Sequence, residues 1–365
     1  MLRFLQRLSA FWFRIQPSVT FLLVVALISY IGYQEYQKRA TPEVVAKMPA
    51  FSTPDTLNTD FPGRRVSSLY LPDSLRFAGE WVPLYEDEVR EKLERELLVN
   101  VFWESHTSYI IKRAYRWFPM IEAMLRKEGI PDDFKYLAVA ESELSNVTSP
   151  AGAKGFWQIM SYTGREYGLE ISGQVDERYD PVKSGEVACK YLRQAYEQFG
   201  NWTVAAASYN MGRAGIQRQM KRQKTTSYYD LVLNRETSRY IYRILAFKLI
   251  LENPERYHFH IPESERYQMP EMREMTIEKS ISDLVSYAHS QGTSYKTLRH
   301  YNPWIKGYTL RVPSGRTYVI QLPKNAPPIH GKRLLVSDSP DSLGQQSPGD
   351  SSSVDSLNDK PQTNN

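Results

Sequence analysis

The chain has 365 residues, which is enough for two or three domains with a sizeable core. Its single cysteine, Cys189, excludes an intramolecular disulfide and a cysteine-rich zinc site. The net charge is +5; residues 336–365 contribute −4, so the remainder carries about +9. A basic body suits an acidic partner such as nucleic acid, an anionic membrane surface or a polyanionic cell wall, although ordinary surface charge accounts for it as well.

Residues 15–34 are the first predicted element, because they contain no charged side chain and follow three arginines with no acid among them. Twenty such residues in a helix reach across about 30 Å of hydrocarbon. The upstream arginines place the N-terminus in the cytoplasm. Neither a small-x-small cleavage site nor a lipoprotein cysteine follows the apolar run. We expect an uncleaved transmembrane anchor within residues 1–40; a cleaved signal peptide is the alternative.

After the anchor, the composition indicates a linker, a helical body, a small mixed module and a tail. Residues 41–80 are rich in Pro, Gly and Asp, as a linker would be, and residues 81–260 show mostly helical apolar spacing. In residues 270–325, a strand "MREMTI", two short helices and a strand "RTYVIQLP" make a βααβ unit. Residues 336–365 contain too few apolar residues for a core, so they are predicted to be disordered. The expected fold class is therefore mainly α.

The stretch "YLAVAESELS" places an acid where the helical pattern calls for a core residue. In a helix opening at Pro131, Glu141 falls on the apolar stripe, seven positions after Phe134. Glu143 lies about 200° around the same helix and points away. Burial raises the pKa of a carboxyl, and a neutral acid near neutral pH is what a general acid requires. An exposed last turn or a pairing with arginine would explain Glu141 without catalysis.

Three later segments add to this feature. Residues 149–160, "SPAGAKGFWQIM", are rich in the small residues that allow close backbone approach. Residues 201–212, "NWTVAAASYNMG", predict a buried helix that ends at Gly212. In "RETSRYIYRILAFKLIL", an acid again shares a core-facing stripe, here Glu236 with Tyr240.

The motifs "ES", "SPAGAKGFWQIM", "SYNMG" and "ETSRYIY", in this order and spacing, resemble the lytic murein transglycosylases with a goose-lysozyme-like fold. The "GFWQ" form and the "VDERYDP" segment look most like the membrane-bound members of that family. The resemblance covers residues 85–323. It implies a helical lysozyme-like domain that cleaves the β-1,4 bond between N-acetylmuramic acid and N-acetylglucosamine in peptidoglycan without water, leaving a 1,6-anhydromuramic end.

The resemblance also implies roles for individual residues. Glu141 matches the single catalytic acid/base of the family. The positions implied to contact the substrate or to line its groove are Ser142, Ser149, Trp157, Gln158, Met160, Tyr209, Asn210, Glu236 and Tyr240. Among these, the rings of Trp157 and Tyr209 are expected to stack on sugar faces. No metal and no cofactor are implied, and Glu236 is the only one of these residues that could supply a second carboxylate.

The sequence departs from the family pattern in the loop after "ES", which reads "LSNVTS" without a proline, and in "SYNMG", where Met211 replaces an alanine. These differences concern sugar contacts more than the chemistry. The unit at residues 272–323 resembles a LysM-type module, which binds N-acetylglucosamine chains, through "LRHYNP". It lacks a clear "GDT" opening, so a packing module without sugar affinity is the alternative.

The expected partners are peptidoglycan glycan strands and, through the anchor, the inner membrane of a Gram-negative cell, with the catalytic domain in the periplasm. No nucleic acid is expected, and the sequence does not identify protein partners. Two other functions fit the same residues. One is a hydrolytic lysozyme-like muramidase on the same fold, and the other is a wall-binding scaffold without enzymatic activity.

Overall fold

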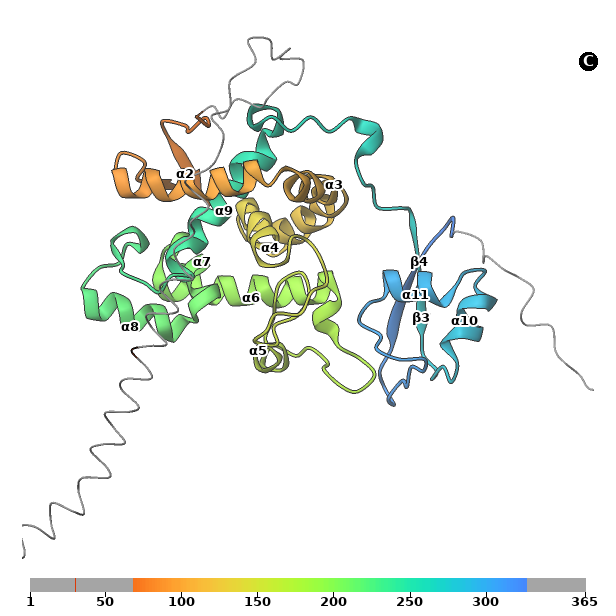
Figure 1. Cartoon of the computed structure of the whole chain (residues 1–365). Helices are drawn as coiled ribbons and strands as arrows, with labels where there is room; N and C mark the ends of the chain where they lie inside the picture. Colours follow the sequence, from red (N-terminus) through yellow and green to blue (C-terminus); the bar gives the residue numbers. More distant parts are fainter. Residues whose placement is uncertain (1–29, 31–67, 327–365) are drawn as a thin grey trace, which may run out of the picture. The chain divides into compact units, whose positions relative to one another are not determined.

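The structure is a computed structural model that describes residue 30 and residues 68–326. The predicted anchor at residues 15–34, apart from Tyr30, and the predicted tail lie outside these residues. Within the described part of the chain, no helix combines the length and apolarity needed to cross a membrane. Figure 1 labels the helices and strands.

The first part of the described chain is helical apart from one short hairpin. Its elements are β1 (Leu75–Phe77), β2 (Glu80–Val82), α2 (Asp87–Phe102), α3 (Glu104–Lys127), η2 (Asp132–Phe134), α4 (Lys135–Ser142), α5 (Ser161–Glu166), η3 (Glu177–Tyr179), α6 (Pro181–Phe199), α7 (Trp202–Met211), α8 (Arg213–Gln223), η4 (Tyr228–Asp230), α9 (Thr237–Glu252), η5 (Pro254–Tyr257) and η6 (Glu263–Glu265).

Helix α9 is the centre of this helical domain, since it packs against α2, α4 and α7 (Figure 1). Its buried residues lie on several sides of the helix, so it lacks the single apolar stripe of an amphipathic helix. By contrast, α6 has one buried stripe, as its spacing predicts. Asp180 caps the start of α6 by accepting from the backbone N–H groups of Val182 and Lys183, and Gly200 ends it with a φ of 65°.

The β1–β2 hairpin belongs to the folded domain, although the sequence assigned residues up to 80 to a linker. The antiparallel pair has Arg76 opposite Trp81, and the turn uses Ala78 and Gly79, both at positive φ. Phe77 is completely buried and packs on Phe134 with ring centroids 5.3 Å apart. Strands of three residues are too short to show an alternating apolar pattern in the sequence. This is why the hairpin was assigned to the linker.

Helix α4 is shorter than the predicted helix. Pro131 precedes a 3-10 turn, the α-helix starts at Lys135, and it ends at Ser142. The next two residues, Glu143 and Leu144, both have left-handed φ values, 54° and 55°. Two successive side chains in that region are costly, so this bend, which begins two residues after Glu141, requires contacts that hold it in place.

The second folded part is the predicted βααβ unit. It consists of β3 (Met272–Ile277), α10 (Leu284–Ser290), α11 (Tyr295–Tyr301) and β4 (Tyr318–Pro323), with β3 and β4 paired antiparallel from Met272 opposite Pro323. Its core cluster is distinct from that of the helical domain, and it includes Val175 from the loop before η3. The "NP" motif has a structural role here. Buried Asn302 donates to the carbonyl oxygens of Leu298 (2.9 Å) and Gln321 (2.7 Å), which ties α11 to β4.

Candidate active site

Glu141 lies in the last turn of α4 and is half-buried. Its Oε1 accepts a hydrogen bond from the hydroxyl of Tyr240 on α9. Tyr240 is itself buried within the helical core, so its hydroxyl has a fixed position. The structure therefore brings together the acid and the tyrosine that two distant motifs supplied, and it joins α4 to α9 at this point.

The surroundings of Glu141 favour its neutral form. Burial raises the pKa of this carboxyl from its ordinary 4.5 to about 7. The hydrogen bond from Tyr240 and the positive charge of Arg243 oppose the rise, whereas the negative charge of Glu236 adds to it. The negative end of the α4 dipole acts in the same direction as burial. A carboxyl with these properties exchanges a proton readily near neutral pH.

Glu143 lies outside α4, in the left-handed bend, and contacts a different helix from the one that contacts Glu141. Its carboxylate lies 2.8 Å from Nε2 of His106 on α3. Arg113, also on α3, donates to the carbonyl oxygen of Glu143 (2.7 Å), which holds the bend in place. The indole of Trp103 stacks on the ring of His106 with centroids 3.8 Å apart. Glu143 thus contributes to a structural contact with α3.

The end of α7 lies against the start of α9 beside Glu141. The hydroxyl of Tyr209 donates to the carbonyl oxygen of Trp157 (2.7 Å). Burial, followed by the nearby charge of Glu141, raises the pKa of Tyr209 well above its ordinary range, so this hydroxyl stays protonated. Asn210 donates to exposed Glu236 (3.1 Å) and accepts from Thr237 (2.8 Å). These residues from "SYNMG" and "ETSRYIY" are therefore neighbours in space.

The loop between α4 and α5 carries the residues of the "SPAGAKGFWQIM" motif. Ser149 accepts from the N–H of Ala153 (3.0 Å) through its hydroxyl. Gln158 has a φ of 45°, and its amide donates to the carbonyl oxygen of Gly155 (2.8 Å). Met160 is 43% exposed. Ser149, Gln158 and Met160 all keep some solvent exposure, as residues lining a groove would.

Two predicted substrate contacts besides Tyr240 occupy core positions instead. Trp157 has no exposed surface, and its Nε1–H donates to the carbonyl oxygen of Pro181 (3.2 Å), so neither ring face is open to a sugar. Ser142 is buried, and its hydroxyl donates to the carbonyl oxygen of Phe156 (2.7 Å). Both residues fasten the motif loop to its neighbours. The loop sequence alone could not show whether the Trp157 ring lines the groove or is buried in the core.

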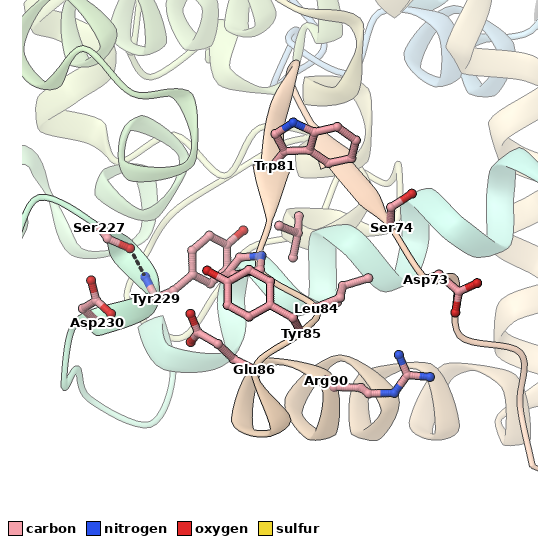
Figure 2. A pocket seen from close by; sticks show the side chains of 12 residues that line it. Asp73, Ser74, Trp81, Leu84, Tyr85, Glu86, Arg90, Ser227, Tyr229 and Asp230 are labelled. Carbon is pink, nitrogen blue, oxygen red and sulfur yellow. Dashed lines mark hydrogen bonds between the residues drawn. The ribbon is translucent and has the colours of Figure 1, made fainter.

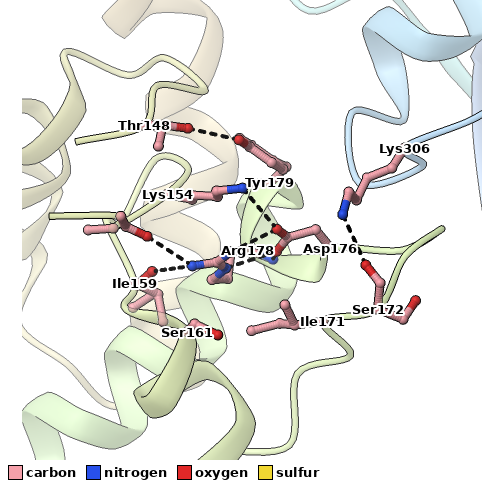
Figure 3. A network of polar contacts seen from close by, with 12 residues as sticks. Thr148, Lys154, Ile159, Ser161, Ile171, Ser172, Asp176, Arg178, Tyr179 and Lys306 are labelled. Carbon is pink, nitrogen blue, oxygen red and sulfur yellow. Dashed lines mark hydrogen bonds and ion pairs between the residues drawn. The ribbon is translucent and has the colours of Figure 1, made fainter. Parts of the chain in front are cut away.

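A buried ion pair holds the motif loop, and the sequence pattern of its segment, "VDERYDP", indicated only a resemblance to the family. Arg178 and Asp176 are almost completely buried and paired, with Nη2 of the arginine 2.8 Å from the carboxylate (Figure 3). Arg178 also donates to the carbonyl oxygens of Gly152 (3.1 Å) and Ile159 (3.4 Å). Its own carbonyl oxygen is so close to Gly155 that an added Cβ would lie 1.9 Å away. The arginine flanked by acids in "DERYD" is the sequence feature from which this ion pair could have been predicted.

Comparisons with known proteins agree with the motifs. Residues 118–232 match the family described as Transglycosylase SLT domain, and residues 273–326 match Soluble lytic transglycosylase C-terminal LysM-like domain. The chain is 30% identical over 246 residues to membrane-bound lytic murein transglycosylase D of Escherichia coli, an alignment that covers 66% of this chain and 53% of that protein. It is 27% identical over 130 residues to the soluble lytic murein transglycosylase of the same organism, covering 32% and 20%.

Among solved structures, an inactive mutant of the lytic transglycosylase Slt from Pseudomonas aeruginosa is 21% identical, covers 49% of this chain and 33% of that one, and has a TM-score of 0.33. The chain spans about half the length of the membrane-bound relative. The predicted resemblance is confirmed: the chain matches an SLT transglycosylase domain followed by a LysM-like domain. Glu141 falls inside the matched SLT residues, whereas Glu236 and Tyr240 lie just beyond them.

Proposed function

We propose that the chain is a peptidoglycan lytic transglycosylase that cleaves the β-1,4 bond between N-acetylmuramic acid and N-acetylglucosamine, with Glu141 as the single general acid/base. The observation that carries the proposal is the state of Glu141. Its pKa is raised to about 7, and a buried tyrosine hydroxyl fixes its position. The SLT domain match and the relatives described above support the same substrate and chemistry.

In the proposed reaction, protonated Glu141 donates its proton to the glycosidic oxygen as the bond from that oxygen to C1 breaks. The resulting carboxylate then accepts the proton of the sugar's own C6 hydroxyl while O6 forms a bond to C1. Glu141 ends as it began, and no water is consumed. The nucleophile belongs to the substrate, so holding O6 close to C1 supplies much of the rate increase. The hydroxyl of Tyr240 stabilises the carboxylate formed between the two proton transfers.

The other carboxylates near the site are engaged in contacts of their own. Glu143 is paired with His106 and faces α3, while Glu236 accepts from Asn210. A hydrolase with two carboxylates needs the second one free on the opposite side of the bond, at about 5–9 Å from the acid. An arrangement in which one acid is held by a buried tyrosine, and the other two are held by separate partners, suits a reaction in which the substrate supplies its own nucleophile.

Hydrolysis remains the second candidate function because of one observation. The charge of Glu236 contributes to the raised pKa of Glu141, so this carboxylate lies within electrostatic reach of the acid. If Glu236 activated a water, the product would carry a reducing end in place of an anhydro end. A third candidate, a wall-binding scaffold without activity, would bind peptidoglycan and release no fragments.

We assign the substrate groove to the exposed or half-buried residues around Glu141, and supporting roles to the buried ones. The proposed groove residues are Ser149, Gln158, Met160, Tyr209, Asn210 and Glu236. Ser142, Trp157 and Tyr240 act through the positions of their neighbours. The LysM-like module is proposed to bind N-acetylglucosamine in the same glycan strands. We further propose that residues 15–34 anchor the chain in the inner membrane, with the catalytic domain in the periplasm.

Digestion of purified peptidoglycan, with mass spectrometry of the released muropeptides, tests this function. Wild-type protein should release anhydro products, each one water lighter than the reducing-end product of a hydrolase. Glu141→Gln should lower the rate by at least about 100-fold, the usual effect of removing a general acid. Glu143→Gln is the matched control and should keep the rate within about tenfold of wild type. Reducing-end products would establish the hydrolase, and bound sacculi without released fragments would establish the scaffold.

A further inference from the structure

A cavity of about 520 Å³ lies on the helical domain between the β1–β2 hairpin, the first turn of α2 and the turn at residues 227–230 (Figure 2). It is distinct from the site at Glu141. The hairpin contacts the first turn of α7, where the carboxylate of Glu80 accepts from the N–H of Trp202 (2.6 Å). Tyr209, which is near Glu141, lies in the last turn of the same helix. The two ends of this ten-residue helix are about 15 Å apart.

Two large aromatic side chains at the cavity are strongly exposed. Tyr85 is 86% exposed and Trp81 is 61% exposed, although both line a concave surface. The guanidinium of Arg76 lies 3.9 Å from the centre of the Trp81 ring and covers one face of it. The other face is therefore available to a ligand. Exposed aromatic rings that border a cavity, unlike scattered apolar residues, mark places where another molecule binds.

The polar residues of the cavity narrow the choice of ligand. Three carboxylates, of Asp73, Glu86 and Asp230, outnumber the single guanidinium of Arg90, which disfavours an anion. Their number also disfavours a purely apolar ligand, because the carboxylates would lose their hydration without gaining partners. Hydrogen-bond acceptors beside flat rings suit a neutral ligand that has many hydroxyl groups and apolar faces, which describes a saccharide.

The hairpin that displays Trp81 is firmly held. The N–H of Ala78 in its turn donates to the carboxylate of Asp133 (2.7 Å). Glu80 accepts three hydrogen bonds at the start of α7, from the backbone N–H groups of Trp202 and Thr203 and from the Thr203 hydroxyl. A ligand that docks on such a rigid surface loses less free energy to ordering than one that docks on a mobile loop.

We propose that this cavity is a second saccharide-binding site, which holds a glycan segment at a distance from the cleavage site by stacking sugar faces on Trp81 and Tyr85. The choice of peptidoglycan glycan as the saccharide rests on the proposed function. A polymer that occupies both sites dissociates less readily than one that occupies either alone. The site therefore increases binding to insoluble sacculi far more than binding to short soluble fragments.

Binding of the full-length chain to peptide-free glycan strands tests the proposal. The chain carries Glu141→Gln so that the strands are not cut. Adding Trp81→Ala or Tyr85→Ala should weaken binding about tenfold, as removal of an aromatic anchor usually does. Tyr70→Ala is the matched control, because Tyr70 is also exposed (46%) and stacked by an arginine, Arg256, but lies outside the cavity. This control should bind like the parent, and all four proteins should give the same circular dichroism spectrum.

Unchanged binding in both folded cavity variants would overturn the proposal. Weaker binding to intact sacculi with normal binding to peptide-free strands would also overturn it, because the cavity carboxylates would then be holding an amine of the stem peptides. In chains that keep Glu141, the same substitutions should slow the release of fragments from sacculi while leaving the cleavage of short soluble glycans unchanged. If the wild type releases no anhydro products, the proposed function fails, and the binding comparison still decides on the cavity.

Discussion

Replacing Glu141 with glutamine should stabilise the protein in a way that grows with pH. Glutamine has the same shape and can still accept from Tyr240, but it carries no charge. In the folded state the pKa of Glu141 is raised to about 7 from its ordinary 4.5, so the folded protein binds this proton more tightly than the unfolded chain does. The stability of the wild type therefore falls as pH rises from 4.5 to 7, and the loss is complete above 7.

The size of the effect follows from the same values. Each unit of pH in that interval changes the free energy of unfolding by about 1.4 kcal/mol. Solvent reaches the half-buried carboxyl and reduces the total, so we expect roughly 2–3 kcal/mol at pH 8. For a domain of this size, such a change raises the melting temperature by about 5–10 °C. At pH 4 the variant and the wild type should melt together, since the carboxyl is protonated in both states of the wild type.

Differential scanning calorimetry of both proteins between pH 4 and pH 8, following the transition of the helical domain, measures this difference. Glu143→Gln is the control. Because Glu143 pairs with His106, this variant should gain no stability over the wild type at alkaline pH. A difference in melting temperature that does not change with pH would refute the reasoning, since it would mean that Glu141 is ordinarily solvated in the folded state. The same variant should have lost its activity, so Glu141 lowers the stability of the wild type at neutral pH while being required for its activity.

Three further predictions follow from contacts around the site. Tyr240→Phe removes a hydrogen bond that favours the carboxylate of Glu141, so the alkaline limb of the pH–rate profile should move up by about one pH unit. Gly155→Ala places a Cβ against the carbonyl oxygen of Arg178 at a φ of 81°, and it should cost about 3 kcal/mol in urea unfolding. Arg178→Met leaves the carboxylate of Asp176 buried with a weaker partner, and should lower the unfolding free energy by about 3 kcal/mol and impair sacculus digestion.

Each of these variants has a matched control in the chain. Tyr228 is another buried tyrosine, and its hydroxyl donates to the backbone carbonyl oxygen of Thr237 and not to Glu141, so Tyr228→Phe should leave the pH profile in place. Gly152 has a φ of 86° but open space around it, so Gly152→Ala should cost only about 1 kcal/mol. Arg165 is an exposed arginine, and Arg165→Met should change stability by less than about 0.5 kcal/mol. Equal effects in a variant and its control would contradict the assigned contact.

The helices and the βααβ unit could be read from the sequence because their signals are local. Apolar spacing and caps identify α6, and the glycine at position 212 ends α7 as predicted. The inward position of Glu141 also followed from helical phase alone. What the sequence did not reveal depends on contacts between distant segments. Trp157 is buried against the start of α6, where it donates to the carbonyl oxygen of Pro181. The hairpin at residues 75–82 is folded because Phe77 packs on Phe134.

The left-handed bend after α4 explains how two acids so close in sequence come to have different properties. Had the helix continued through Glu143, that carboxylate would have faced solvent without a fixed partner. The bend instead brings it to His106, while Arg113 holds the carbonyl oxygen of the same residue. One acid is thereby held in a structural contact with α3. The other, at the negative end of α4 and against Tyr240, is kept near the pKa at which it can give a proton and take one back. The strain of two left-handed residues is consistent with a role in separating these two states.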